Sequence, residues 1–292
     1  MEENTAILRA RRFLEAHNVT SAPVDVTALA QAEGFEVKLK ELPEGEAGST
    51  LERRGKRYIL VNEQDPPMRQ RFTILHEIAH HVLNLPSVHG QASEPSESAL
   101  TSSPARPPEE KACDAFASEC LVPLAVIKPM IEGKPFGVQI VAELARSFGA
   151  SQHCVASQFV KASTECVAFV LAEEGRIKLA FPSTALRAAG VRLLRGTSVP
   201  RGCAAEVAMS AEDGAVRTAE SEGTDWSHSD AAEGFSVYEE ASFYAPRQQT
   251  YSFLTFEAME SERPSDSARF TQGDDELLPE LTGELTWRPK AR

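Results

Sequence analysis

Residues 71–83 of the chain read Arg-Phe-Thr-Ile-Leu-His-Glu-Ile-Ala-His-His-Val-Leu. Prolines bound this stretch on both sides, at positions 66 and 67 upstream and at position 86 downstream. Proline is tolerated where a helix begins but ends a helix when it lies further inside. The apolar residues between these prolines recur at helical spacing. We therefore expect one continuous helix with an apolar stripe along one side.

Two histidines on this helix have the spacing of metal ligands. His76 and His80 are four residues apart, so their imidazoles should lie one above the other on the same face. Two such imidazoles can bind one metal ion, and Glu77 can point at a water on that ion. The alternative is a chance match in a helix whose histidines serve only the fold. The proline-bounded, half-apolar context favours the metal site.

A second expected helix, residues 109–121, offers a third ligand. Catalytic zinc sites usually have three protein ligands, which leaves one position for water. Glu110 and Asp114 are four apart, so one can bind the metal while the other accepts the N–H of a ligating histidine. We assign Glu110 as ligand and Asp114 as partner, but spacing alone leaves the neighbouring acids open. The alternative is a solvated acidic face near a helix N-terminus.

These motifs together are similar to those of a known family. Arg71-Phe72-Thr73-x-x-His76-Glu77-x-x-His80, followed by Glu110-x-x-Cys-Asp114-x-Phe-Ala-x-x-x-Leu-x-Pro123, resembles the ImmA/IrrE metallopeptidases over roughly residues 23–161. The resemblance implies that His76, His80 and Glu110 bind Zn²⁺, with Mn²⁺ as a second candidate, and that Glu77 is the general base. The chain departs from the family at Asp114, where Asn is usual, and in a long Ser/Pro-rich stretch before Glu110.

The same resemblance gives an expected architecture of the α+β class. Residues 1–125 would form a zincin-like metallopeptidase domain, followed by a helix-turn-helix-like region over 126–163. Residues 164–272 would form a GAF-like α+β sensor or interaction domain, and 273–292 a flexible tail. The C-terminal domain would sense a small-molecule or other signal, or hold a protein substrate.

The resemblance is strongest to the IrrE regulators of the radiation and DNA-damage response. It implies a site-specific, zinc-dependent endopeptidase that cleaves a helix-turn-helix (XRE-type) repressor and so induces stress genes. Glu77 would take a proton from the attacking water, and Asp114 would orient His76. Besides the metal, no group that stabilises the oxyanion can be assigned, and His81 and His153 are minor candidates for this role.

Composition limits the other classes of function. The formal net charge of -13 argues against general binding to DNA or to anionic membranes, and no apolar run reaches membrane-spanning length. The first residues carry no signal peptide pattern. Five scattered cysteines without a Cys-x-x-Cys pair fit a reducing cytoplasm, with no disulfide expected.

Residues 138–148 and 152–161 have the outline of a helix-turn-helix. The second of these helices offers Lys161 as its one cation, whereas a DNA-reading helix should carry Arg, Asn or Lys near its start. We therefore favour a helical pair that packs on the peptidase core, and direct DNA binding is disfavoured. Two alternatives stay open: a DNA-binding regulator with a structural metal site, and a processing protease without a specific target.

The remaining elements follow from apolar patterning. Strands are expected over 35–39, 48–52 and 58–61, and a β-hairpin over 167–171 and 177–181. A short helix is expected over 183–190, and further strands over 204–209, 235–239 and 251–257. The Ser/Pro-rich residues 86–108, which include His89, should form a loop.

Overall fold

The first part of the chain places a small sheet directly before the histidine-bearing helix. The computed structural model describes residues 1–43, 45–86 and 107–259. The elements up to that helix are α1 (Glu3–Ala16), α2 (Val26–Ala32), β1 (Phe35–Lys40), β2 (Gly48–Arg53), β3 (Lys56–Asn62) and α3 (Pro67–Val82). Strand β3 lies in the middle of the sheet, parallel to β1 and antiparallel to β2. Most of the predicted 86–108 loop with His89, residues 260–272 and the predicted tail lie outside the described residues.

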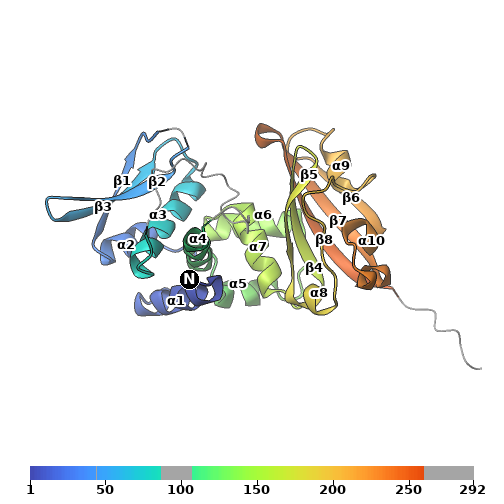
Figure 1. Cartoon of the computed structure of the whole chain (residues 1–292), viewed down its shortest axis with the longest axis horizontal. Coiled ribbons are helices and arrows are strands. Elements are labelled where there is room, and N and C mark those ends of the chain that lie inside the picture. Colours follow the sequence, from blue (N-terminus) through green and yellow to red (C-terminus); the bar gives the residue numbers. More distant parts are fainter. Residues whose placement is uncertain (44, 87–106, 260–292) are drawn as a thin grey trace, which may run out of the picture. The chain divides into compact units, whose positions relative to one another are not determined.

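Helix α3 packs between this sheet and the next helix. It contacts β2 and β3 on one side and α4 (Pro108–Leu121) on the other (Figure 1). Helix α4 in turn packs on α1, and every residue from Ala112 to Val122 is buried. Three further helices follow: α5 (Leu124–Ile131), α6 (Val138–Phe148) and α7 (Gln152–Ala162). The site-bearing helices thus lie in the interior, where their side chains are held by packing on several sides.

The second part of the chain is rich in strands. Its strands are β4 (Val167–Glu173), β5 (Arg176–Pro182), β6 (Val216–Glu222), β7 (Phe235–Tyr244) and β8 (Gln249–Ala258), in the antiparallel order β5-β4-β8-β7-β6. Its short helices are α8 (Thr184–Ala188), α9 (Ala204–Ala208) and α10 (Gly223–Trp226), with 3₁₀ turns at Asp230–Gly234 and Ala245–Arg247. The protein is therefore of the mixed α+β class, as the sequence predicted.

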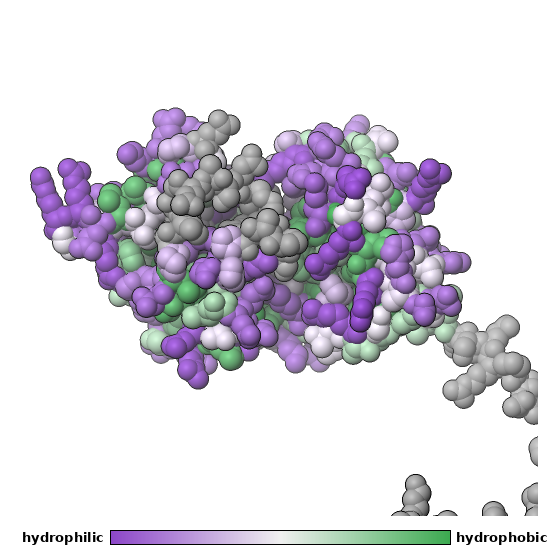
Figure 2. Space-filling model, viewed as in Figure 1, coloured by the Kyte–Doolittle hydropathy of each residue, from purple (hydrophilic) through white to green (hydrophobic). Residues whose placement is uncertain are grey.

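The five-stranded sheet is covered on both faces. One face, with Phe169, Leu171 and Phe253, joins the apolar core of the N-terminal helices. The opposite face, with Val170 and Leu254, packs with the short helices in a second core. Strand β4 is consequently buried on both faces, which explains its unbroken apolar run from Val167 to Ala172. On the outer surface shown in Figure 2, hydrophilic side chains predominate.

One prediction about the second part of the chain was wrong, and one strand was not predicted. Residues 204–209, predicted as a strand, contain helix α9, because three alanines pack on the sheet and Glu239 accepts from its first amides. Strand β6, which no prediction included, lies at the edge of the sheet. Its exposed residues are mostly polar, so it lacks the apolar alternation that marks a half-buried strand.

Adjacent glutamates of β7 bind the N-termini of two helices on opposite faces of the sheet. Glu239 accepts hydrogen bonds from the amides of Ala204 (2.7 Å) and Ala205 (3.1 Å) at the start of α9. Glu240 accepts from the amide of Val138 (2.9 Å) at the start of α6. Carboxylates satisfy the free amides of a helix N-terminus and complement its dipole. The pair therefore ties β7 to both layers of helices.

The other structural expectations concern cysteines and membranes. All five cysteines are free, in agreement with the expected absence of a disulfide framework. Among the residues that the structure describes, no helix has the length and apolar character needed to cross a membrane. Residues 1–259 form one compact unit, so the boundaries predicted near 125 and 163 stay predictions.

The buried side chain of His153, near the start of α7, makes the free energy of unfolding depend on pH. Its imidazole is buried against Phe169 and Phe181, and neither ring nitrogen has a hydrogen-bond partner among the described residues. Burial lowers its pKa from 6.5 to about 4, so the unfolded chain binds this proton more tightly than the folded chain. Stability should fall as the pH drops from about 6.5 to about 4, by up to ~3 kcal/mol from this residue.

Urea denaturation of the wild type and of His153→Leu at pH 7.5 and pH 5 tests this expectation. The variant should lose less stability between the two pH values than the wild type, because it carries no proton acceptor at this position. Equal losses in the two proteins would contradict the assignment.

Candidate metal centre

Helix α3 holds its histidines in a rigid, buried segment. Pro67 occupies the first turn, where the missing amide has no cost, and Thr73 to His80 are all buried. At the other end, Asn84 adopts a left-handed conformation (φ 55°), and the amide of Leu85 donates to the carbonyl of His80. This bond ends the helix one turn after the second histidine.

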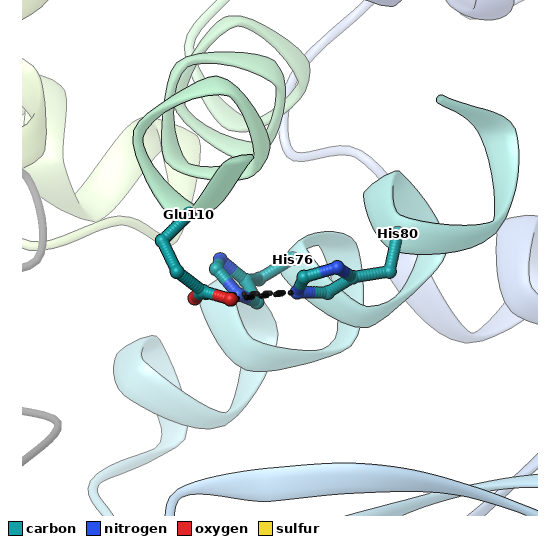
Figure 3. Close-up of side chains that lie close together, drawn as sticks. All are labelled: His76, His80 and Glu110. Carbon is teal, nitrogen blue, oxygen red and sulfur yellow. Dashed lines mark hydrogen bonds and ion pairs between the residues drawn. The ribbon is translucent and has the colours of Figure 1, made fainter. Parts of the chain in front are cut away.

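Glu110 on α4 faces both histidines of α3 (Figure 3). Its Oε2 lies 3.2 Å from His76 Nε2, and its Oε1 lies 3.5 Å from His80 Nε2. The two Nε2 atoms are 3.1 Å apart. All three residues are buried, with at most 7% of their surface exposed. The two imidazole nitrogens and the Glu110 carboxylate thus form a compact buried triangle of side-chain groups.

Asp114, one turn further along α4, fixes the orientation of His76. Its Oδ1 lies 2.9 Å from His76 Nδ1, which donates the hydrogen bond. Burial by itself would lower the pKa of His76. The hydrogen bonds to Asp114 and Glu110, with the charges of Asp114 and Glu77, outweigh it and raise the pKa to about 10. The pocket between the two helices therefore strongly favours a positive charge.

The donor set fits a divalent cation. With Nδ1–H of His76 donating to Asp114, a neutral His76 presents the Nε2 lone pair toward Glu110, so two acceptors face each other. Ligands of a tetrahedral zinc ion with bonds of ~2.1 Å lie about 3.4 Å from one another. The distances of 3.1, 3.2 and 3.5 Å match this spacing. The three side chains form a group able to hold a metal ion, whose identity the donor types do not fix.

Glu77 lies between α3 and the edge strand β2. It is fully buried, and its Cγ is 3.9 Å from the position that a Cβ on Gly48 would occupy. That Cβ would also clash with the Thr73 side chain and lie 2.8 Å from the carbonyl oxygen of Leu60. Glycine at position 48 is thus what lets β2 approach α3 next to the general-base candidate.

The structure brings the five predicted site residues to one place. His76, His80 and Glu110 converge, Asp114 bonds to His76, and Glu77 follows His76 on α3. The two histidines named as candidate oxyanion-stabilising groups lie elsewhere. His81 contacts Arg57 and packs its ring on Phe35, whereas His153, on α7, is buried against Phe169.

Arg71, quoted in the sequence motif without a role, anchors the site helix. Its guanidinium donates to the carbonyl of Gly149 (2.9 Å) and to that of Val24 (2.7 Å). Burial lowers the pKa of Arg71, while Asp25 acts in the opposite direction. Gly149 is left-handed (φ 59°), and a Cβ there would lie 3.1 Å from Arg71 Nε. The sequence contains no signal for this role, because the two carbonyl acceptors lie far from Arg71 along the chain.

Comparison with known proteins agrees with this geometry. Residues 31–158 match the family model of the IrrE N-terminal-like domain, Peptidase_M78, a match that includes all five site residues. The predicted resemblance to the ImmA/IrrE family is thereby confirmed over this part of the chain. A search of curated proteins found no match.

A solved structure shares the fold of this chain. It is a Mycobacterium tuberculosis transcriptional regulator, with a TM-score of 0.58, 13% identity, and coverage of 87% of this chain and 89% of that one. At this identity the similarity concerns the fold alone. It extends well beyond the matched domain, so the strand-rich part of the chain belongs to the shared architecture.

Replacing Asp114 should weaken metal binding through His76. Asp114→Ala removes the acceptor that orients the imidazole, so Zn²⁺ affinity should fall by about 10- to 100-fold. Asp114→Asn keeps an acceptor oxygen and should bind Zn²⁺ nearly as tightly as the wild type. Competition with a chromogenic chelator measures both affinities. Equal losses in the two variants would show that the charge of Asp114, not its hydrogen bond, matters.

Proposed function

We propose that this protein is a site-specific metalloendopeptidase that cleaves an XRE-type transcriptional repressor and thereby induces DNA-damage or radiation response genes. The observation that carries the peptidase part is the triangle of His76, His80 and Glu110 beside the buried carboxylate of Glu77. The IrrE N-terminal-like domain supports a metallopeptidase or regulator of this kind. The repressor as substrate follows from the family resemblance.

Each side chain would have a distinct task. His76, His80 and Glu110 would hold the metal, with Zn²⁺ favoured and Mn²⁺ as the second candidate. When bound, such an ion supplies Lewis-acid chemistry that activates water and polarises a carbonyl. Glu77 would take the proton of the attacking water and pass it to the leaving amine. Asp114 would keep Nδ1 of His76 protonated, so that Nε2 stays available as a ligand.

The edge strand β2 offers a place for an extended substrate. It pairs with β3 on one side, and no strand of the described residues pairs with its other side. An extended peptide can add to such an edge through main-chain hydrogen bonds. Because Glu77 and Gly48 are neighbours, a peptide on β2 would run past the general base. This arrangement favours a linker segment of the repressor as the site of cleavage.

A regulator that binds DNA itself is the alternative function. The structurally similar mycobacterial protein is a transcriptional regulator, which keeps this reading open. The second helix of the helix-turn-helix-like pair argues against it, because α7 is buried from His153 through Val160. A helix with these residues buried cannot enter a major groove in the same conformation.

Incubation with an XRE-type repressor encoded in the same genome tests the proposal. The Zn²⁺- or Mn²⁺-loaded protein should give one discrete cut, seen by intact mass. Glu77→Gln should slow cleavage by about 10²- to 10⁴-fold, because the general base is lost. Its metal content should stay at the wild-type level. A bound but intact repressor in every metal would support the binding regulator instead.

Gly48→Ala should separate cleavage from metal binding. The added methyl would push β2 away from Thr73 and the Leu60 carbonyl, which displaces the edge strand from Glu77. Cleavage should fall by about tenfold or more, as expected when a reacting group is misplaced by a fraction of an ångström. Zn²⁺ affinity, measured with a chelator, should change little, since the ligands lie on α3 and α4. A parallel loss of both would indicate general unfolding.

A further inference from the structure

A hollow beside the metal centre gathers an excess of positive charge. Its volume is about 170 Å³, and residues of α4, α7, β5 and α8 line it. One water molecule needs about 10–15 Å³ on this measure, so the hollow can hold a larger molecule. Four cations line it: Lys111, Lys161, Arg187 and Arg195. The acidic groups in the lining are Glu3 and Asp114, and Asp114 already bonds to His76.

This charge balance runs against the composition of the chain. The sequence has 43 acidic and 30 basic residues, whereas the lining of the hollow has four cations and two acids. Within the described part of the chain, no carboxylate forms an ion pair with Lys111, Lys161 or Arg187. Cations that line one hollow without forming ion pairs to carboxylates indicate a site for an anion.

Lys161 and Arg187 are like charges that line the same hollow. Desolvation by the surrounding protein lowers the pKa of Lys161, and the nearby Arg187 lowers it further. The carboxylates of Glu119 and Glu3 act in the opposite direction without removing the shift. A bound anion between the two cations would relieve their repulsion.

Other groups give the hollow the character of a small-molecule site. The Arg195 guanidinium is held in the lining by a hydrogen bond to the carbonyl of Ala180 on β5 (2.6 Å). A planar, fixed guanidinium suits phosphate oxygens. The ring of Phe181 also lines the hollow and stacks on Phe169 (interplanar angle 12°), so it offers an apolar wall. Charged groups on one side and a ring on another are typical of pockets for small organic anions.

We propose that this hollow binds a phosphorylated small molecule, with Lys111, Lys161, Arg187 and Arg195 around the phosphate and Phe181 against its apolar part. The cations come from four separate segments, α4, α7, α8 and the loop after α8, so the site depends on how the strand-rich part packs on the N-terminal helices.

The hollow shares one residue with the metal centre. Lys111, Asp114, Ala115 and Ser118 occupy one face of α4, and Asp114 is also the partner of His76. A phosphate bound next to Asp114 should change the electrostatic field at the ligand histidine. The bound ligand should therefore alter the affinity of the site for metal. That it would thereby regulate cleavage rests on the proposed peptidase function.

Titration calorimetry of the full chain with inorganic phosphate, pyrophosphate and adenosine monophosphate tests the site. At least one probe should bind saturably. Lys161→Gln and Arg187→Gln should each weaken that binding about tenfold or more, as expected for the loss of a charge-assisted contact. Arg192→Gln, an exposed cation outside the lining, is the matched control and should leave affinity unchanged.

Two results would overturn the site: no saturable binding of any probe, or equal weakening in Arg192→Gln and Arg187→Gln. Melting temperatures of all variants show whether a loss comes from misfolding.

For the link to the metal centre, Zn²⁺ affinity is measured with and without the bound probe in wild type and Arg187→Gln. A change of about fivefold or more in the wild type alone supports the coupling, and an unchanged affinity overturns it. Measuring Zn²⁺ affinity does not require cleavage, so this experiment tests the coupling even if the protein is not a peptidase.

Discussion

The burial of five ionisable side chains between α3 and α4 is the constraint on which the rest of the structure depends. His76, His80, Glu77, Glu110 and Asp114 are at most 7% exposed, and three of them are carboxylates. Carboxylates taken out of water require compensating positive charge. Asp114 and Glu110 raise the pKa of His76, so a proton there is favoured, and a divalent cation held by three of these side chains would supply more positive charge. Positive charge between the two helices therefore favours their close packing.

The surrounding contacts keep these two helices in place from both sides. Arg71 joins α3 to the turn between α6 and α7. On the other helix, buried Glu119 accepts from Arg11 of α1 (2.8 Å) and from Gln158 of α7 (3.4 Å). Such long-range polar contacts fix positions to within fractions of an ångström, which a metal site requires. The scaffold therefore determines the distance between the ligands, and not only their presence.

Much of the fold and site could be predicted from the sequence, and the failures have physical causes. Helical periodicity and bounding prolines were sufficient for the helix with His76 and His80, because these signals are local. The choice of Glu110 over neighbouring acids required a family resemblance, since it depends on how α4 rotates against α3. The helix at 204–208 was missed because its N-terminal amides are satisfied by Glu239, 35 residues away in the chain. The phosphate hollow could not be found from sequence for the same reason: its cations come from separate elements.

The adjacent glutamates of β7 also constrain how the five-stranded sheet can assemble. Neighbouring residues of a strand point to opposite faces, so a shift of β7 by one residue would turn each carboxylate to the other layer. One glutamate would then take the place of the other, and the second helix would meet Tyr238 or Ala241 instead of a carboxylate. The first amides of that helix would lose their acceptor, and one carboxylate would lose its partners. The observed alignment of β7 is therefore the one in which both helices, one on each face, keep a carboxylate at their N-terminus.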